Sequence, residues 1–150
     1  MTEKELLLKD LCSRLPYGVK MNHIVDNEVS PSTLLGINED YVILQGTGGY
    51  SYVPVEDYKP YLYPLSSISE EQSKELFNLF GINLVDSIVT DYIKINECTG
   101  ITFFLDKGFD IETHLDKLLD WLNKNHFDYR GLIEKELALD ASNLGIYGNK

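Results

Sequence analysis

Apolar residues near the N-terminus recur at helical spacing, with polar residues between them. The leucines of this face are Leu7, Leu8, Leu11 and Leu15. Thr2 and Glu5 fit a capping box, in which each side chain binds the backbone N–H of the other residue. Pro16 disfavours helix at the residue before it, so we expect the helix to end near Arg14.

Between residues 17 and 65 the pattern changes to short runs rich in β-branched and aromatic residues, separated by turn residues. The predicted strands are Val19–Val25, Thr33–Ile37, Tyr41–Leu44 and Tyr50–Val55. Turns are expected at Asn38–Asp40 and Gly46–Gly49. Antiparallel strands of this length predict a small curled sheet or an SH3-like barrel. Prolines at 54, 60 and 64 then favour an extended exit, because proline cannot donate to a strand ladder.

The second half of the chain predicts two helices, a hairpin and a short strand. Ser69 and Gln72 fit another capping box, for a helix ending near Gly81. Ile88–Ile95 and Ile101–Leu105 are typical of two paired strands. The clearest amphipathic helix runs from Ile111 to Lys124. Its apolar face is formed by Leu115, Leu118, Leu119 and Leu122, and we expect these residues to be buried together.

The region after this helix is expected to turn at Asp128–Gly131 and to form a short strand before a loose, Asn- and Gly-rich end. The chain has 150 residues, of which 43% are hydrophobic, enough for a core without disulfides. The sequence therefore predicts one compact α+β domain over residues 1–150, with a division into subdomains near residues 66–69 as an alternative.

The chain is strongly acidic, and its net charge limits the kinds of molecule that it is expected to bind. Asp and Glu number 24 against 13 Lys and Arg, which gives a net charge of -11. Such a chain repels phosphate backbones, so we expect no nucleic-acid binding and favour a basic protein partner. An apolar run of about 18 residues, the length of a membrane span, is absent, and the first residues do not form a signal peptide. We expect a cytoplasmic protein that does not bind membranes.

The cysteines and histidines do not predict a metal site. Cys12 and Cys98 lack the C-x-x-C or C-x-x-H spacing of zinc ligands, and two cysteines are too few for a disulfide scaffold. His23, His114 and His126 lack an H-x-x-x-H spacing. We expect both cysteines to be reduced and buried, and we expect no metal and no cofactor.

Three blocks of the sequence together resemble an uncharacterised family of small proteins abundant in Bacteroidales genomes, their phages and prophages. The blocks are LCSRLPYGVK at 11–20, VEDYKPYLYPLSSISEEQ at 55–72 and WLNKNHFDYRGLIEKELALD at 121–140. The closing block is the most specific, because NHFDYRGLI at 125–133 matches the family's hallmark. Glu136 departs from the family, whose members usually carry glycine there, and residues 81–105 have no counterpart. The resemblance implies a phage or mobile-element context and assigns no activity or catalytic residue.

Half of the ten tyrosines lie within fourteen residues: Tyr50, Tyr52, Tyr58, Tyr61 and Tyr63. Alternating aromatic residues on a curled sheet can pack in a core, anchor a protein partner or stack nucleic-acid bases. Glu56 and Asp57 in the same window argue against bases, because the region lacks a cationic groove. The sequence therefore favours core packing for this cluster, with a protein-binding surface as the alternative.

The closing block gathers four chemically active side chains directly after a predicted helix: His126, Asp128, Tyr129 and Arg130. Together they could transfer a proton or bind an anion or a protein partner. The structural alternative is that His126 interacts with the helix C-terminus, Asp128 closes a turn and Arg130 pairs with a carboxylate. The sequence favours the structural interpretation.

These features lead to two function hypotheses. The first is a non-catalytic accessory protein of phage or mobile-element type that binds a host or phage protein, for which interference with host defence is one role that fits. The second is a binder or hydrolase of a small anionic metabolite or nucleotide, with Arg130 holding the anion and His126 as the acid or base.

Overall fold

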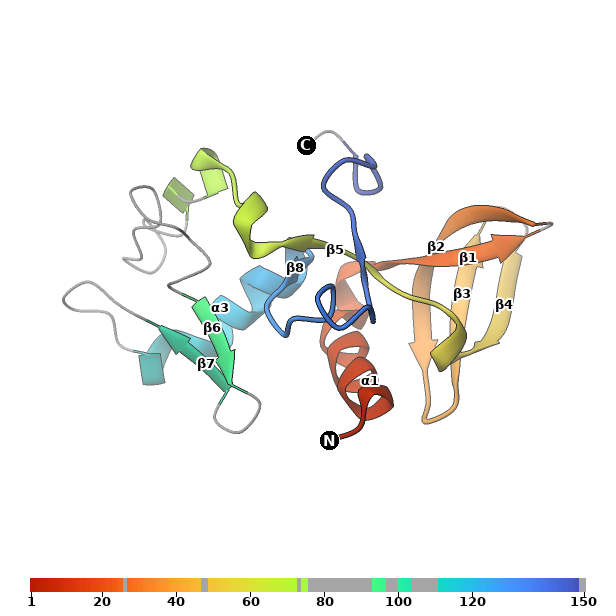
Figure 1. The fold of residues 1–150 in the computed structure, drawn as a ribbon, viewed down its shortest axis with the longest axis horizontal. Helices are drawn as coiled ribbons and strands as arrows, with labels where there is room; N and C mark the ends of the chain where they lie inside the picture. Colours follow the sequence, from red (N-terminus) through yellow and green to blue (C-terminus); the bar gives the residue numbers. More distant parts are fainter. Residues whose placement is uncertain are drawn as a thin grey trace. The chain divides into compact units, whose positions relative to one another are not determined.

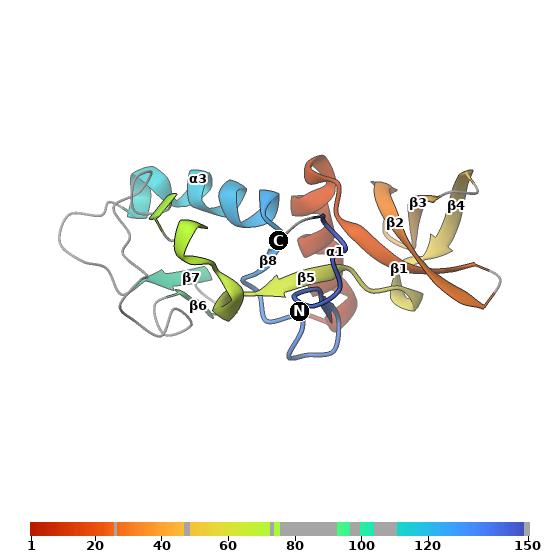
Figure 2. The same cartoon turned by 90° about the horizontal axis from the view of Figure 1, so that it is seen from above.

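The structure, a computed structural model, describes the backbone of residues 1–25, 27–46, 49–72, 74–75, 93–96, 100–103 and 111–148. The chain groups into two compact units, which are described separately below. The first unit contains residues 1–63 and 132–150, and the second contains residues 64–131. The fold is mixed α+β with a small curled antiparallel sheet, which confirms the predicted class (Figures 1 and 2). The expectation of one domain stays a prediction.

The first unit opens with the predicted helix, α1 (Glu3–Arg14). The predicted capping box is present, because the Glu5 N–H donates to Thr2 Oγ1 at 3.1 Å and the Thr2 N–H donates to Glu5 Oε2 at 2.7 Å. These bonds favour the charged carboxylate, so the pKa of Glu5 lies below its usual value. After Arg14 the chain tightens into a 3₁₀ turn (Leu15–Tyr17) and reverses at Gly18, whose φ is +68°.

One buried face of α1 carries an ion pair that the sequence pattern did not indicate. Arg14 Nε lies 2.8 Å from Asp10 Oδ2, and both side chains are 0% exposed. The two residues are one helical turn apart, so α1 itself holds them together. Because an isolated buried charge is costly, each group offsets part of the desolvation of the other.

The sheet follows α1 and contains strands β1 (Lys20–Val25), β2 (Glu28–Ile37), β3 (Tyr41–Gly46) and β4 (Gly49–Pro54), in that order. All neighbours are antiparallel. β2 begins at Glu28, five residues before the predicted Thr33, and it includes Pro31. Pro31 faces Asn22 in a pair that exchanges no backbone bonds, so its missing N–H is not needed there.

The core of the first unit lies between one face of the sheet and α1. Leu7 and Leu11 of α1 belong to the same buried cluster as the inward residues of all four strands. The other members of this cluster are Val19, Met21, Leu34, Val42, Leu44, Val53, Val55, Leu62, Leu132 and Ala138. Residues from both ends of the unit's sequence therefore meet in one core.

The β1 edge of the sheet is closed by the segment that follows β4. The Asn22 N–H donates to the Lys59 carbonyl at 3.0 Å, and the Lys59 N–H donates to Asn22 Oδ1 at 2.6 Å. Met21 also forms a β-bridge with Pro60. Strand β5 (Tyr61–Pro64) follows directly and pairs in parallel with β9 (Leu139–Asp140).

In the second unit the described residues confirm most of the predicted elements. β6 (Ile93–Asn96) and β7 (Gly100–Phe103) form an antiparallel hairpin, and α3 spans Ile111–Lys124 as predicted. The Ser69–Gln72 capping box is present, and residues 70–72 and 74–75 are helical. The rest of that helix lies outside the described residues, as do the predicted strand positions 88–92 and 104–105.

The apolar face of α3 is buried where the structure describes it. Leu118 and Leu122 are fully buried and Leu119 is half-buried, whereas the Leu115 side chain lies outside the described residues. Trp121 is buried too, and its ring stacks on Phe127 with centroids 5.7 Å apart. The predicted leucine face is thus confirmed for Leu118 and Leu122.

The predicted turn at Asp128–Gly131 is wrong at its start. Phe127 and Asp128 form the short strand β8. The chain reverses earlier, at His126, whose φ is +61° and whose N–H donates to the Asn123 carbonyl at 3.1 Å. Because the helix is already terminated at His126, the following residues are free to extend.

Between the predicted turn and the predicted short strand, which is β9 (Leu139–Asp140), the chain forms a capped helical turn in residues 132–137. The Leu137 N–H donates to the Leu132 carbonyl at 2.8 Å, and the Glu136 N–H donates to the Ile133 carbonyl at 3.1 Å. This pair of bonds defines a Schellman motif, in which the next-to-last residue adopts a left-handed conformation. That residue is Glu136, with φ +60°. Glycine is preferred at this position because it has no Cβ to oppose a positive φ.

Replacing Glu136 with glycine should therefore stabilise the protein. We expect the Glu136→Gly variant to gain up to about 1 kcal/mol in free energy of unfolding, because a left-handed residue with a Cβ is strained. The matched control is Glu134→Gly, an exposed position in the same turn without a positive φ, which should lose about 0.5–1 kcal/mol. Urea denaturation of both variants checks the prediction. Equal losses in the two variants would contradict it.

Tyr147 connects the C-terminal segment to the rest of the first unit by hydrogen bonds. Its hydroxyl accepts from the Lys20 N–H at 2.8 Å and donates to the Tyr61 carbonyl at 2.7 Å. The ring also packs at a tilt on Tyr63, with centroids 5.8 Å apart. Burial raises the pKa of Tyr147 far above its ordinary value of 10.0. One side chain thereby links the start of β1, the start of β5 and the last described turn.

Removing this hydroxyl should lower stability in a pH-dependent way. The Tyr147→Phe variant leaves one N–H and one carbonyl without this partner, so we expect a loss of about 1–3 kcal/mol near neutral pH. Because the folded pKa is raised, the wild type keeps this contribution below pH 10.0 and loses it as the pH rises toward the folded pKa. Urea denaturation at neutral and alkaline pH checks this. A stability difference that stayed constant above pH 10.0 would contradict the pKa argument.

Candidate functional site

The outer face of the sheet exposes three tyrosines. In β3 and β4 the alternate residues Val42, Leu44 and Val53 point into the core, so their neighbours point the other way. Tyr41, Tyr50 and Tyr52 are 50%, 69% and 75% exposed. We call these three residues the tyrosine face.

The register of the sheet brings the three rings close to one another. Tyr41 pairs with Pro54 and Tyr52 pairs with Ile43, so Tyr41 and Tyr52 are diagonal neighbours on one face, about 7–8 Å apart at the backbone. Tyr50 lies two residues before Tyr52 and therefore about 7 Å along the same strand. Between the strands, Ile43 lies over Gly36, where a Cβ would approach Ile43 Cδ1 to 3.1 Å. Ile43 thus links the tyrosine face on β4 to the bulged part of β2.

The ladder also fixes where the backbone groups of β4 point. The Val55 N–H donates to the Asp40 carbonyl at 3.0 Å, which makes 40 and 55 a hydrogen-bonded pair. Bonded and non-bonded pairs alternate in an antiparallel ladder, so Val53 and Ser51 bond to β3 whereas Tyr52 and Tyr50 do not. The N–H and C=O groups of Tyr50 and Tyr52 therefore point toward the free side of β4.

β4 is the open edge of the sheet. Within the described residues, β3 is the strand that pairs with it, whereas the opposite edge at β1 is closed by Lys59 and Pro60. Proteins usually protect open edges with charged residues, prolines or bulges. The β4 sequence GYSYVP carries no charge and has its proline at the last position. Tyr50 and Tyr52 thus combine exposed rings with backbone groups that bond to no strand among the described residues.

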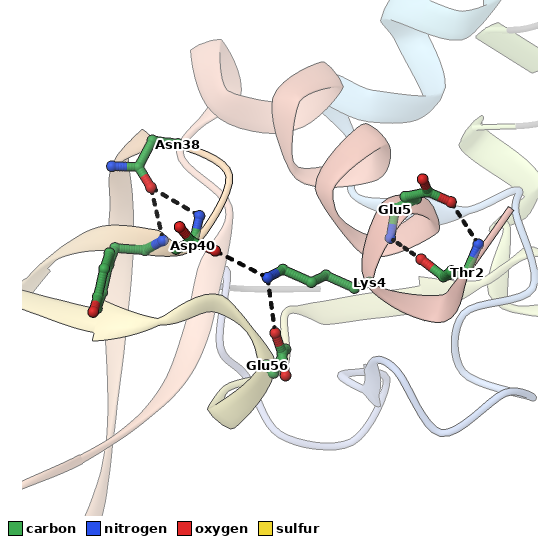
Figure 3. A network of polar contacts seen from close by, with 7 residues as sticks. Thr2, Lys4, Glu5, Asn38, Asp40 and Glu56 are labelled. Carbon is green, nitrogen blue, oxygen red and sulfur yellow. Dashed lines mark hydrogen bonds and ion pairs between the residues drawn. The ribbon is translucent and has the colours of Figure 1, made fainter.

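Four exposed carboxylates border the tyrosine face at its Tyr41–Pro54 end. We call them the acidic rim: Glu39, Asp40, Glu56 and Asp57. Lys4 reaches across from α1, with Nζ 3.1 Å from Asp40 Oδ1 and 3.0 Å from Glu56 Oε1 (Figure 3). Hydrogen bonds to Glu56 and then Asp40 raise the pKa of Lys4. One lysine against four carboxylates leaves this end of the face negative.

The turn that presents the rim is held by Asn38. Its side-chain oxygen accepts from the Asp40 N–H at 2.9 Å and from the Tyr41 N–H at 2.8 Å (Figure 3). Asn side chains commonly close turns in this way. The turn therefore fixes Asp40 beside Tyr41 at the corner of the sheet.

The structure divides the tyrosine cluster that the sequence presents as one candidate surface. Tyr50 and Tyr52 are exposed, whereas Tyr61 and Tyr63 in β5 are buried and burial raises the pKa of both. Tyr58 is half-buried and packs edge-on against His23, with centroids 5.5 Å apart. Alternation stops being informative at β5, because three consecutive residues of this strand are buried.

Residues 126–130 of the closing block lie in the second unit, and most of their side chains are buried. His126, Asp128 and Tyr129 are less than a tenth exposed, and the Tyr129 hydroxyl donates to Asn123 Oδ1 at 2.8 Å. Arg130 is half-buried, and its guanidinium carbon lies 4.7 Å from the centroid of the Tyr129 ring. These contacts favour the packing interpretation of this block over an exposed binding site.

A serine–histidine pair inside the first unit is placed for packing. His23 Nδ1 lies 3.2 Å from Ser32 Oγ, which donates to the Ser30 carbonyl. Ser32 is 0% exposed, so a substrate cannot reach its hydroxyl. In the part of the chain that the structure describes, His, Cys, Asp and Glu do not gather in a group that could hold a metal ion. Nor does any helix of that part have the length and apolarity to cross a membrane. The expectation of a buried Cys12 is wrong, because this residue lies on the exposed side of α1, and Cys98 lies outside the described residues.

Comparisons with protein-family models, with curated proteins and with solved structures find no match.

Sequence reasoning missed Tyr41 as a member of the exposed face. The signal was present, because Tyr41 is out of phase with Val42 and Leu44 in the alternation of β3. The sequence could not predict in the same way that β4 lies at the edge of the sheet. This position depends on which strand follows β4 in space, and that is set by long-range pairing.

The backbone of β4 should show alternating amide exchange. We expect the Tyr50 and Tyr52 amides to exchange much faster than those of Ser51 and Val53, because only the latter bond to β3. Residue-resolved hydrogen exchange by NMR measures this directly. Uniform protection along β4 would show that its outer edge is covered.

Proposed function

We propose that this protein is a non-catalytic accessory protein of phage or mobile-element type, which binds a host or phage protein through the tyrosine face. The observation that carries the proposal is the exposure of Tyr50 and Tyr52 on an uncharged edge strand. Large exposed aromatic side chains are costly to solubility and are typical of binding hot spots.

Two further features support a protein partner. The net charge of -11 disfavours nucleic acid and membrane surfaces, which are themselves negative. The resemblance of the three sequence blocks to a phage and prophage family supports the accessory role and a site of action in the bacterial cytoplasm. Interference with a host defence protein is one role of this kind.

The proposal predicts a partner whose capture depends on the tyrosine face. Tagged wild-type protein should recover, from a Bacteroidales lysate, a protein that untagged chain displaces in a saturable manner. Replacing Tyr50 and Tyr52 with serine should reduce its affinity, since each hot-spot truncation costs about 2 kcal/mol or more. Quantitative mass spectrometry of the eluates measures the loss.

The matched control is Leu144→Ser, which changes an apolar residue that is 55% exposed and lies outside the sheet. It should leave recovery unchanged. All variants should unfold within about 0.5 kcal/mol of the wild type, because these side chains are on the surface. A partner retained equally by the tyrosine variant would refute the tyrosine face as the binding site.

A further inference from the structure

We propose that β4 binds a basic, extended segment of the partner by strand addition, with the added strand pairing at Tyr50 and Tyr52. This inference rests on the proposed function and adds the chemistry and geometry of the bound segment. It follows from three observations that meet at one edge of the sheet.

The first observation is the unused hydrogen-bonding capacity of β4. Tyr50 and Tyr52 each direct an N–H and a C=O away from β3, at alternate positions about 7 Å apart. An extended strand presents its own groups at the same interval and can form four backbone bonds there. Such main-chain bonds supply affinity in strand addition, whereas the flanking side chains supply specificity.

The second observation is that the same two residues supply the side-chain contacts. Their rings lie on the outer face, directly beside the path of an added strand, and Tyr41 extends the aromatic surface inward. Every second side chain of the added strand would lie on this face. Lysine and arginine suit the position because their stems pack on the rings and their charges are attracted to the ring faces.

The third observation is the charge at the end of β4. The acidic rim flanks the Tyr41–Pro54 pair, because Glu39 and Asp40 precede Tyr41 whereas Glu56 and Asp57 follow Pro54 after Val55. Lys4 contacts the rim through Asp40 and Glu56. A basic segment would meet complementary charge there. A second copy of the chain is disfavoured as the occupant, because each copy carries a net charge of -11.

The test uses the full-length protein and a synthetic peptide of alternating lysine and valine, capped at both ends. A peptide with glutamate in place of lysine is its counterpart. We expect the lysine peptide to bind at least about tenfold more tightly, and its affinity to fall as salt is added. In the complex, amide exchange should slow at Tyr50 and Tyr52 and stay unchanged at Ser51 and Val53.

Three variants separate the contribution of charge at Tyr52 from that of its aromatic ring. Tyr52→Lys should weaken binding of the lysine peptide at least about tenfold by repulsion, whereas Tyr52→Phe should keep the affinity within about twofold. Leu144→Lys adds the same charge at an exposed site outside the sheet, and it should have no comparable effect. Because both positions are exposed, loss of folding does not confound the comparison.

Each alternative outcome is distinct. Binding without new protection at Tyr50 and Tyr52 would overturn strand addition. Equal affinity for both peptides, or no binding of the lysine peptide at about millimolar concentration, would overturn the basic segment. Dimerisation of the free protein that Tyr52→Lys abolishes would make a second copy the occupant. The tyrosine-dependent partner of the lysate experiment could still be found in each case, so failure here is separable from failure of the proposed function.

Discussion

The sheet of the first unit is covered on one face, and most of its other features depend on this. The side chains of α1 and of residues 132–138 pack with the inward residues of the strands, which leaves the outward residues to water. Side chains alternate between the two faces along β3 and β4, so of any two consecutive residues one points into the core and the other points to water. Where the outward residue is a tyrosine, an exposed aromatic surface results. The pairing with β3 that places the Val53 side chain in the core also directs the N–H and C=O of Tyr52 away from β3. The exposed ring of Tyr52 and the outward direction of its backbone groups therefore have one cause, the register of β4 on β3.

The predictable parts of this fold were those with local causes. The N-terminal helix begins at Thr2 and ends at Arg14 because its capping box and its proline act over a few residues. α3 matched its predicted limits for the same reason, since its leucine face is continuous. The start of β2 was predicted too late, because Pro31 fits into the strand only through its register with β1, which is a long-range property.

The candidate site was predictable only in part. A count of tyrosines could not distinguish Tyr52 from Tyr61, because the difference lies in which strand covers each residue. The Asp10–Arg14 pair was hidden for a related reason, since charged residues on a helix are normally exposed. In the closing block, by contrast, the sequence by itself singled out Glu136. Glu136 has a left-handed backbone, a conformation for which glycine is preferred, and the family resemblance, which stays a prediction, expects glycine there.

The contact of Tyr147 with Lys20 and Tyr61 has a consequence for how the protein is made. Residues 64–131 are synthesised after β5 and before the segment that completes the first unit. At roughly 5–20 residues per second, the ribosome needs several seconds to pass this insertion. During that time the nascent sheet lacks Leu132 and Ala138 of its core and the Tyr147 fastening. The first unit, although it begins the chain, is therefore completed last, after the whole of the second unit has left the ribosome.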